Sequence, residues 1–236
     1  MPDIRILTSC TGQKQHSPAG ELTQADFRHL HDPAAFTQRE GELARYRLPA
    51  AEMYTGMQHV RLMEGIAAFE KSAGEGQVDL WIVSAGYGLI PAAREIVPYE
   101  CTFQEMKLTE VDAWAEHLGL PTAARTLFAR PADLVVVLLG TKYLRALALD
   151  RRVRFGAPTL FFAAGSSRRY IQGQGRLRVV ELGKQEATRY SCGLVGLKGE
   201  VARRLLLRLA AEGDALMERL FNPDTDVLPL LDRSPE

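Results

Sequence analysis

Four short apolar runs in this chain each end at a cluster of small or hydroxyl residues. The runs are Ile4 to Thr8, Leu80 to Val83, Leu134 to Leu139 and Leu160 to Phe162. Because continuous aliphatic and aromatic runs without alternation are typical of strands buried on both faces, they predict a parallel sheet covered by helices. The ligand of such a sheet lies beyond the carboxyl ends of its strands, so we expect any chemistry at the four loops that follow.

The rest of the pattern predicts an α/β fold with a mostly parallel central sheet of four to five strands, flanked by helices on both faces as a three-layer sandwich. Helices are expected at about 57–71, 106–129 (broken at Gly119 and Pro121) and 200–211, and Arg178 to Leu182 alternates like a fifth strand. With 236 residues, 46% of them hydrophobic, we expect one domain over 1–221 with a loop-rich insertion at about 13–49. Prolines after Asn222 predict a loosely ordered tail over 222–236.

Composition limits the setting of the protein. The chain has no apolar stretch of the roughly 18 residues that a membrane span needs, so no membrane partner is expected. Its start, Met1 to Ile4, lacks the basic and apolar pattern of a signal peptide, which predicts a cytoplasmic protein. Three cysteines, Cys10, Cys101 and Cys192, have neither paired nor metal-ligand spacing, so we expect no disulfide framework and no metal site.

Charge is balanced overall but unevenly distributed. The chain has 29 basic and 29 acidic residues, yet the segment from Arg151 to Val180 contains seven arginines and no acid. Such a block produces a local positive field, and arginine suits phosphate contacts, so we expect DNA as a partner. The alternative is a solvated surface whose arginines pair with acids from elsewhere in the fold.

The densest chemistry follows the second run, where two tyrosines and two acids lie close in sequence. Gly86 and Gly88 flank Tyr87 in a tight turn, and Tyr99 precedes Glu100 shortly after Glu95. Aromatic faces stack on a flipped base, and a carboxylate stabilises an oxocarbenium-like sugar or activates water, so these residues predict a nucleobase pocket with Glu100 or Glu95 as the catalytic acid. The alternative is that both tyrosines are packing residues.

Phosphate-binding candidates occur in three segments. Ser9, Thr11 and Lys14 follow the first run, and Ser166, Ser167, Arg168 and Arg169 follow the fourth. Lys198 lies in a glycine-rich segment, Gly193 to Gly199, that precedes a helix and resembles the hairpin of helix-hairpin-helix proteins, although the glycine spacing differs. A plain helix start with flexible glycines is the alternative. Cys10 is a candidate nucleophile activated by Lys14 or His16, and an inert buried thiol is the alternative.

The order of several motifs resembles an uncharacterised bacterial domain family related to the peroxide-stress YaaA-like proteins. The motifs are Ile6 to Lys14, Tyr54 to Gly56, Ser84 to Leu89 and Pro98 to Glu100. The serine-cysteine start is also similar to that of the accessory domain of archaeosine synthase. This resemblance covers roughly residues 4 to 150 and implies an α/β fold akin to uracil-DNA glycosylase, in nucleic-acid repair, base modification or defence against phage with modified DNA. It adds Tyr54 to the expected base pocket. Gln13 and Glu100 depart from the family pattern.

Three functions remain open at this point. The first is a DNA glycosylase that excises a modified or damaged base, with no cofactor required. The second is a non-catalytic DNA-binding stress protein that uses the same basic surface. The third is an enzyme that cleaves a free nucleoside or nucleotide, for which the arginine block is incidental.

Overall fold

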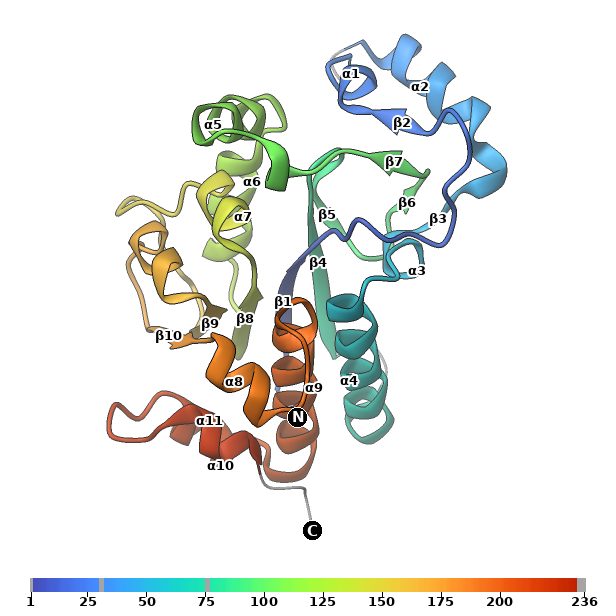
Figure 1. Cartoon of the computed structure of the whole chain (residues 1–236). Coiled ribbons are helices and arrows are strands. Elements are labelled where there is room, and N and C mark those ends of the chain that lie inside the picture. Colours follow the sequence, from blue (N-terminus) through green and yellow to red (C-terminus); the bar gives the residue numbers. More distant parts are fainter. Residues whose placement is uncertain (1, 30–31, 75–76, 233–236) are drawn as a thin grey trace.

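The computed structural model describes residues 2–29, 32–74 and 77–232, and a six-stranded sheet forms its centre (Figure 1). The strands, in spatial order, are β10 (Leu177–Glu181), β9 (Thr159–Ala163), β8 (Leu134–Leu138), β1 (Ile4–Ser9), β4 (Val78–Ser84) and β5 (Gly88–Pro91). Five strands are parallel, which confirms the mostly parallel α/β sheet. The expected count of four to five strands was too low, because β5 adds an antiparallel edge strand through a tight turn after β4.

The connections reverse direction next to β1. The chain first places β4 on one side of β1 and later places β8 on its other side, from which β9 and β10 continue outward. The loops that leave β1 and β8 therefore diverge at the carboxyl end of the sheet. Open α/β sheets bind ligands in the crevice that this divergence opens.

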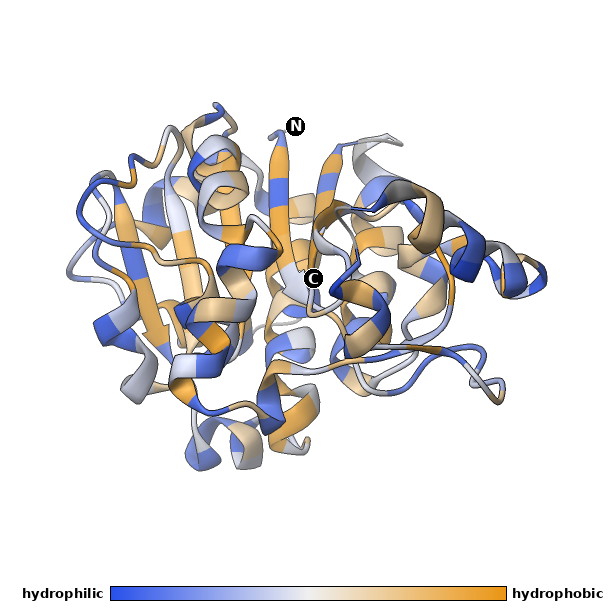
Figure 2. Ribbon diagram, turned by 90° about the horizontal axis from the view of Figure 1, so that it is seen from above, coloured by the Kyte–Doolittle hydropathy of each residue, from blue (hydrophilic) through white to orange (hydrophobic). Residues whose placement is uncertain are grey.

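Helices cover both faces of the sheet, and side chains of each strand alternate between them. Ile4 and Ile6 of β1 face α4 (Met57–Ala73) and α9 (Leu194–Glu212), whereas Leu7 faces the opposite core. That second core is closed by α5 (Leu108–His117), α6 (Leu120–Ala129) and α7 (Thr141–Ala146). Figure 2 shows the strands as apolar ribbons between these helices. The apolar runs of the sequence therefore form strands buried on both faces.

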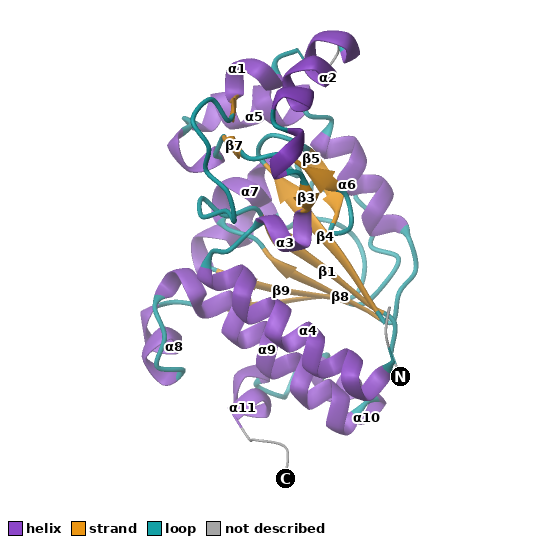
Figure 3. Cartoon of the chain, turned by 90° about the vertical axis from the view of Figure 1, so that its right-hand side faces the viewer, coloured by secondary structure: helices purple, strands orange, loops and turns teal. Residues whose placement is uncertain are grey.

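Helices α4 and α9 lie side by side at very close range (Figure 3). A Cβ atom on Gly199 would lie 2.2 Å from the carbonyl oxygen of Gln58, and one on Gly65 would lie 2.7 Å from the Cα atom of Arg203. Gly196 and Gly199 are thus helix-contact residues inside α9, and the expected loop before residue 200 was wrong from Leu194 onward. Lys198 consequently lies in the second turn of a long helix.

The segment expected as a loop-rich insertion contains several short elements. They are β2 (Leu22–Thr23), α1 (Gln24–Phe27), α2 (Pro33–Glu42), η1 (Ala44–Tyr46) and β3 (Leu48–Pro49), followed by α3 (Ala50–Met53). Strand β2 pairs with β7 (Tyr99–Glu100), and β3 pairs with β6 (Glu95–Ile96). The buried ring of Phe27 joins the core. Residues 13–49 are therefore attached to the segment that carries both candidate carboxylates.

The carboxyl-terminal part adds α8 (Lys184–Arg189), α10 (Asp214–Leu220) and α11 (Val227–Asp232). Helix α11 lies within the expected tail, yet Val227 and Leu231 are buried, and the Tyr190 hydroxyl donates to the Leu228 carbonyl over 3.3 Å. Residues 233–236 of that expected tail lie outside the described residues. Among the helices of residues 2–29, 32–74 and 77–232, none has the length and apolar character to cross a membrane.

Candidate functional site

A crevice of about 710 Å³ lies at the carboxyl end of the sheet, where the connections reverse. Its walls are the loop from Ser9 to Gln13 after β1, the start of α4 (Gly56 to Gln58), the residues Cys101, Thr102 and Gln104, the α7 region (Gly140 and Tyr143), and Leu194, Val195 and Lys198 of α9. Ser9, Thr11 and Lys198 of the predicted phosphate set are thus brought together from distant parts of the chain. The crevice corresponds to the ligand position expected of the fold.

The walls of the crevice favour an anion. Helices α4 and α9 both begin there, and the first N–H groups of a helix have no acceptor within it, which leaves partial positive charge at each start. Among the described residues, neither an aspartate nor a glutamate lines the crevice, and Lys198 has no ion-pair partner. Burial lowers the pKa of Lys198 because the charged ammonium is partly removed from water. An anionic ligand would supply the missing counter-charge.

The loop after β1 is held in place by its own contacts. The Thr11 hydroxyl donates to the Gln13 carbonyl over 2.6 Å and accepts from the Gly56 N–H over 3.2 Å. A Cβ atom on Gly56 would lie 2.7 Å from the Thr11 Cβ atom, so only glycine permits this approach. The loop is therefore fixed directly against the start of α4.

Two cysteines line the crevice without the surroundings of a nucleophile. The Cys10 sulfur lies 3.1 Å from the Tyr143 hydroxyl oxygen, and the Lys14 ammonium lies instead over the Tyr99 ring, 4.6 Å from its centroid. Burial raises the pKa of Cys101 to about 12, which keeps this thiol protonated. The geometry favours the inert reading of Cys101 and gives Cys10 a hydroxyl neighbour rather than a cation.

The residues Tyr54, Ser84 and Tyr99, which we call the tyrosine cluster, form a buried hydroxyl chain. The Tyr99 oxygen lies 2.8 Å from the Tyr54 oxygen and 2.8 Å from the Ser84 oxygen. Ser84 Oγ also accepts the N–H groups of Gly86 and Tyr87, so its own proton is directed toward Tyr99. Burial raises the pKa of both phenols. The rings of Tyr54 and Tyr99 are in the core and present no open face to a base.

Tyr87 is also a packing residue in this structure. Its hydroxyl donates to Glu40 over 2.9 Å and accepts the Val97 N–H over 3.2 Å. The Phe27 ring meets the Tyr87 ring edge-on at 5.0 Å, and a Cβ atom on Gly86 would lie 2.5 Å from Phe27. Gly88 has a φ of +76°, which favours glycine in the turn between β4 and β5. The predicted base pocket of tyrosines is therefore filled by the aromatic ring of the insertion.

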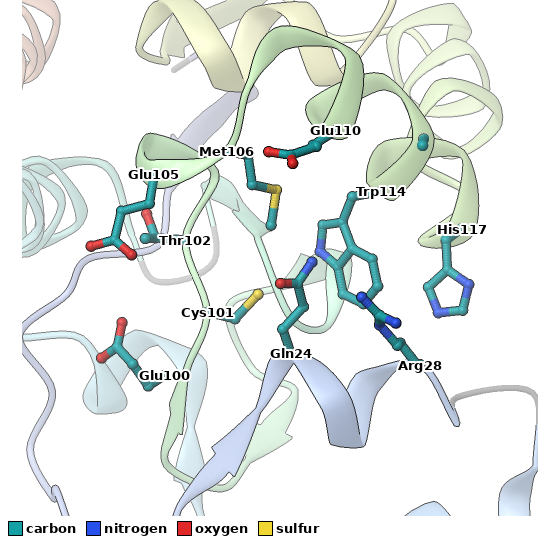
Figure 4. Close-up of a pocket in the computed structure, with 11 residues that line it drawn as sticks. Gln24, Arg28, Glu100, Cys101, Thr102, Glu105, Met106, Glu110, Trp114 and His117 are labelled. Atoms are coloured by element: carbon teal, nitrogen blue, oxygen red, sulfur yellow. The ribbon is translucent and has the colours of Figure 1, made fainter.

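A second cavity, the side pocket, adjoins the crevice through the residues that both share, Cys101 and Thr102 (Figure 4). It measures about 600 Å³ and lies between α1 and α5. The Trp114 indole forms one wall, with its N–H donated to the Ala85 carbonyl over 2.8 Å and its ring stacked on His117 at 4.8 Å. The side pocket thus has the aromatic wall that we expected from the tyrosines.

The two candidate carboxylates are separated by the fold. Glu100 lines the side pocket, next to the shared Cys101. Glu95 is exposed on β6 and lines neither cavity. The structure therefore brings only Glu100 to the vicinity of the crevice.

The residues after the fourth run lie outside the crevice lining, in η3 (Gly165–Tyr170). Ser166 is exposed, and the buried Ser167 hydroxyl lies 2.7 Å from the Thr141 hydroxyl. Arg168 pairs with Glu181 at 3.3 Å, and Arg169 lies over the Tyr170 ring at 5.0 Å. These contacts hold η3 together and do not direct its side chains into the crevice.

The predicted arginine block does not form one free surface. Arg178 donates to the carbonyls of Leu220 and Asn222 over 2.8 and 2.6 Å, Arg152 pairs with Asp150 at 2.6 Å, and Arg176 lies over the Phe221 ring. Several of the arginines therefore hold chain segments together, as in the alternative interpretation of the block.

The structure assigns places near the site to residues that sequence reasoning missed. Gln58, at the start of α4, donates to the Thr8 hydroxyl over 2.9 Å and to the Leu138 carbonyl over 3.1 Å. It thereby joins β1 to β8 below the crevice. Trp114 was missed because its helical periodicity marks a core residue equally well. The signal for Gln58 was its position directly after the Tyr54 to Gly56 motif.

Comparison with known families gives one match. The model of a family of unknown function, DUF6884, matches residues 41–170. The chain belongs to this family. A search of curated proteins finds no match. The DUF6884 region contains the start of α4, the tyrosine cluster, both candidate carboxylates and the start of α7, whereas the loop after β1 and Lys198 lie outside it. The crevice is therefore completed by segments on either side of the DUF6884 region.

Proposed function

We propose that the protein binds a nucleotide unit of DNA at the crevice and hydrolyses the N-glycosidic bond of a modified or damaged base. The observation that carries this proposal is the unpaired Lys198, which lines a crevice built from two helix starts and free of acids among the described residues. A phosphate is the anion that such helix starts and a lysine bind best. The adjoining side pocket supplies an aromatic wall for a base.

The two cavities divide the nucleotide between them. The phosphate lies in the crevice, the base lies against Trp114 in the side pocket, and the sugar lies near the shared Cys101 and Thr102. Glu100 then stabilises the oxocarbenium-like sugar or accepts a proton from water. The bond between C1′ and the base nitrogen breaks, the water oxygen bonds to C1′, and the base leaves with a proton. Extruding the base costs a few kcal/mol, which phosphate binding offsets.

The motif resemblance supports the same setting. The motifs shared with the YaaA-like proteins and with the accessory domain of archaeosine synthase include the loop after β1 and the segment before Glu100. We accordingly place the activity in base repair, modification or phage defence, in the cytoplasm. We also propose that residues 1–221 act as one unit.

A free nucleotide is the second candidate substrate, and the arginine contacts favour it. Because Arg152, Arg168 and Arg178 are engaged within the chain, the surface available to a DNA backbone is smaller than the sequence indicated. A free nucleotide needs only the crevice and the side pocket.

An alkali-cleavage assay on DNAs with different base modifications, paired with a gel shift, tests the proposal. The wild-type chain should create abasic sites, Glu100→Gln should abolish them, and Glu95→Gln should retain them. Cleavage of nucleotides without DNA cleavage favours the second candidate. Salt-sensitive DNA binding with no chemical change overturns the enzyme proposal in favour of a DNA-binding stress protein, and so does excision that survives loss of both carboxylates.

A further inference from the structure

Resting on the proposed function, we infer that the side pocket selects bases that are cationic at neutral pH, such as ring-alkylated purines, over neutral bases. The inference concerns the substrate class and follows from the charge of the side pocket. That charge is opposite in sign to that of the crevice, although the two cavities share Cys101 and Thr102.

The wall of the side pocket suits a flat cation. The Trp114 indole is only 7% exposed, its N–H is already bonded to Ala85, and Met106 lies beside it (Figure 4). The indole therefore interacts with a ligand only through its ring. Among aromatic side chains, tryptophan binds a cation at its ring face most strongly.

Acids outnumber bases around the side pocket. Glu100, Glu105 and Glu110 line it, and Glu110 accepts the Lys107 N–H over 2.6 Å. In the described part of the chain, Glu100 and Glu105 have no ion-pair partner. Their carboxylates are acceptors only, so a neutral base leaves them without a counter-charge.

The lining arginine does not neutralise these acids. Figure 4 shows Arg28 beside Trp114 and His117, whereas Glu100 and Glu105 lie together on the other side of Cys101. The acidic side is the one that carries the proposed catalytic residue. A positive base placed there gains attraction to two carboxylates and also has a weakened glycosidic bond.

Two isomeric nucleotides isolate the effect of charge. In 1-methyl-2′-deoxyadenosine 5′-monophosphate the base is a cation at neutral pH, whereas in the N6-methyl isomer it is neutral. Calorimetric titration of the full chain should give at least about tenfold tighter binding of the cationic isomer. Glu105→Gln should reduce this preference at least about threefold, because one carboxylate is lost.

Glu116→Gln is the matched control, since Glu116 is exposed on the same helix, α5, and lines neither cavity. It should leave the preference unchanged. Equal binding of the two isomers overturns the inference and leaves the proposed function intact, and so does a preference that Glu105→Gln does not reduce or that Glu116→Gln reduces equally. Absence of binding by both isomers overturns the proposed nucleotide site itself.

Discussion

The tyrosine cluster and the crevice are both built from residues that follow strands, but they use their polar groups in opposite ways. In the cluster, the hydroxyls of Tyr54, Ser84 and Tyr99 bond to one another, and Phe27 packs on the Tyr99 ring. In the crevice, Lys198 and the starts of α4 and α9 have no internal counter-charge among the described residues.

This difference separates stability from binding. A buried polar group that is bonded within the fold adds to stability and is costly to disturb. A polar group without an internal partner costs stability in the empty protein and is compensated when a ligand binds. Substitutions in the two regions should therefore move different quantities.

Truncation of Tyr99 should have the largest effect on stability. Its ring is fully buried and in edge contact with Phe27, so Tyr99→Ala should lower the free energy of unfolding by about 3–5 kcal/mol. Urea denaturation measures the loss. Lys198→Ala is the counterpart in the crevice and should lower it by less than about 1 kcal/mol. Similar losses from both substitutions would contradict the contrast between the two regions.

Removal of the Tyr99 hydroxyl alone should cost less. Tyr99→Phe leaves Ser84 and Tyr54 without their shared partner, and we expect a loss of about 1–3 kcal/mol. The control is Tyr46→Phe, because the half-buried Tyr46 has no hydrogen-bond partner for its hydroxyl within the described ranges. A loss no greater than that of the control would show that the hydroxyl chain does not stabilise the core.

The sequence predicted the sheet better than the site because the two depend on different kinds of information. Apolar runs at Ile4, Leu80, Leu134 and Leu160 depend only on local composition, and all became buried strands. Strand β5 was missed because four residues carry little periodicity. The loop after β1 and Lys198 were identified correctly as crevice residues by the rule for parallel sheets.

Long-range packing accounts for what the sequence left out. Whether Tyr87 and Tyr99 face solvent or the core depends on Phe27, which arrives from an insertion that had no clear pattern. The glycines before residue 200 indicated flexibility, but their role is contact with Gln58 of α4. Pairing between Arg168 and Glu181 depends on how η3 meets β10. None of these partners is visible from local sequence.

Removal of the Lys198 charge should affect binding and not folding. Lys198→Met should weaken binding of a nucleotide 5′-phosphate at least about tenfold, because a charge-assisted contact is lost. The free energy of unfolding should stay constant or rise, since a partly buried cation is replaced by an apolar side chain. Lys184→Met, an exposed change on α8, is the control for charge. Unchanged affinity would remove Lys198 from the proposed site.

The lowered pKa of Lys198 predicts opposite pH trends for the empty and bound protein. Between that lowered pKa and the ordinary value of 10.5, the unfolded chain holds more protons than the folded one, so the empty protein should gain stability as pH rises. Phosphate affinity should fall over the same interval, because the ammonium is lost. Urea midpoints and titrations across this range measure both trends, and Lys198→Met should abolish each.

Arg168 should give the smallest effects, and it sharpens the comparison between a paired and an unpaired cation. Its pair with Glu181 is exposed on both sides, so Arg168→Gln should change the free energy of unfolding by at most about 1 kcal/mol. If DNA binds, the dependence of log affinity on log salt should keep its slope, because Arg168 is already engaged within the chain. Lys198→Met, by contrast, should reduce that slope by about 0.9, the value for one phosphate contact. A reduced slope for Arg168→Gln would extend the phosphate-binding surface from the crevice to η3.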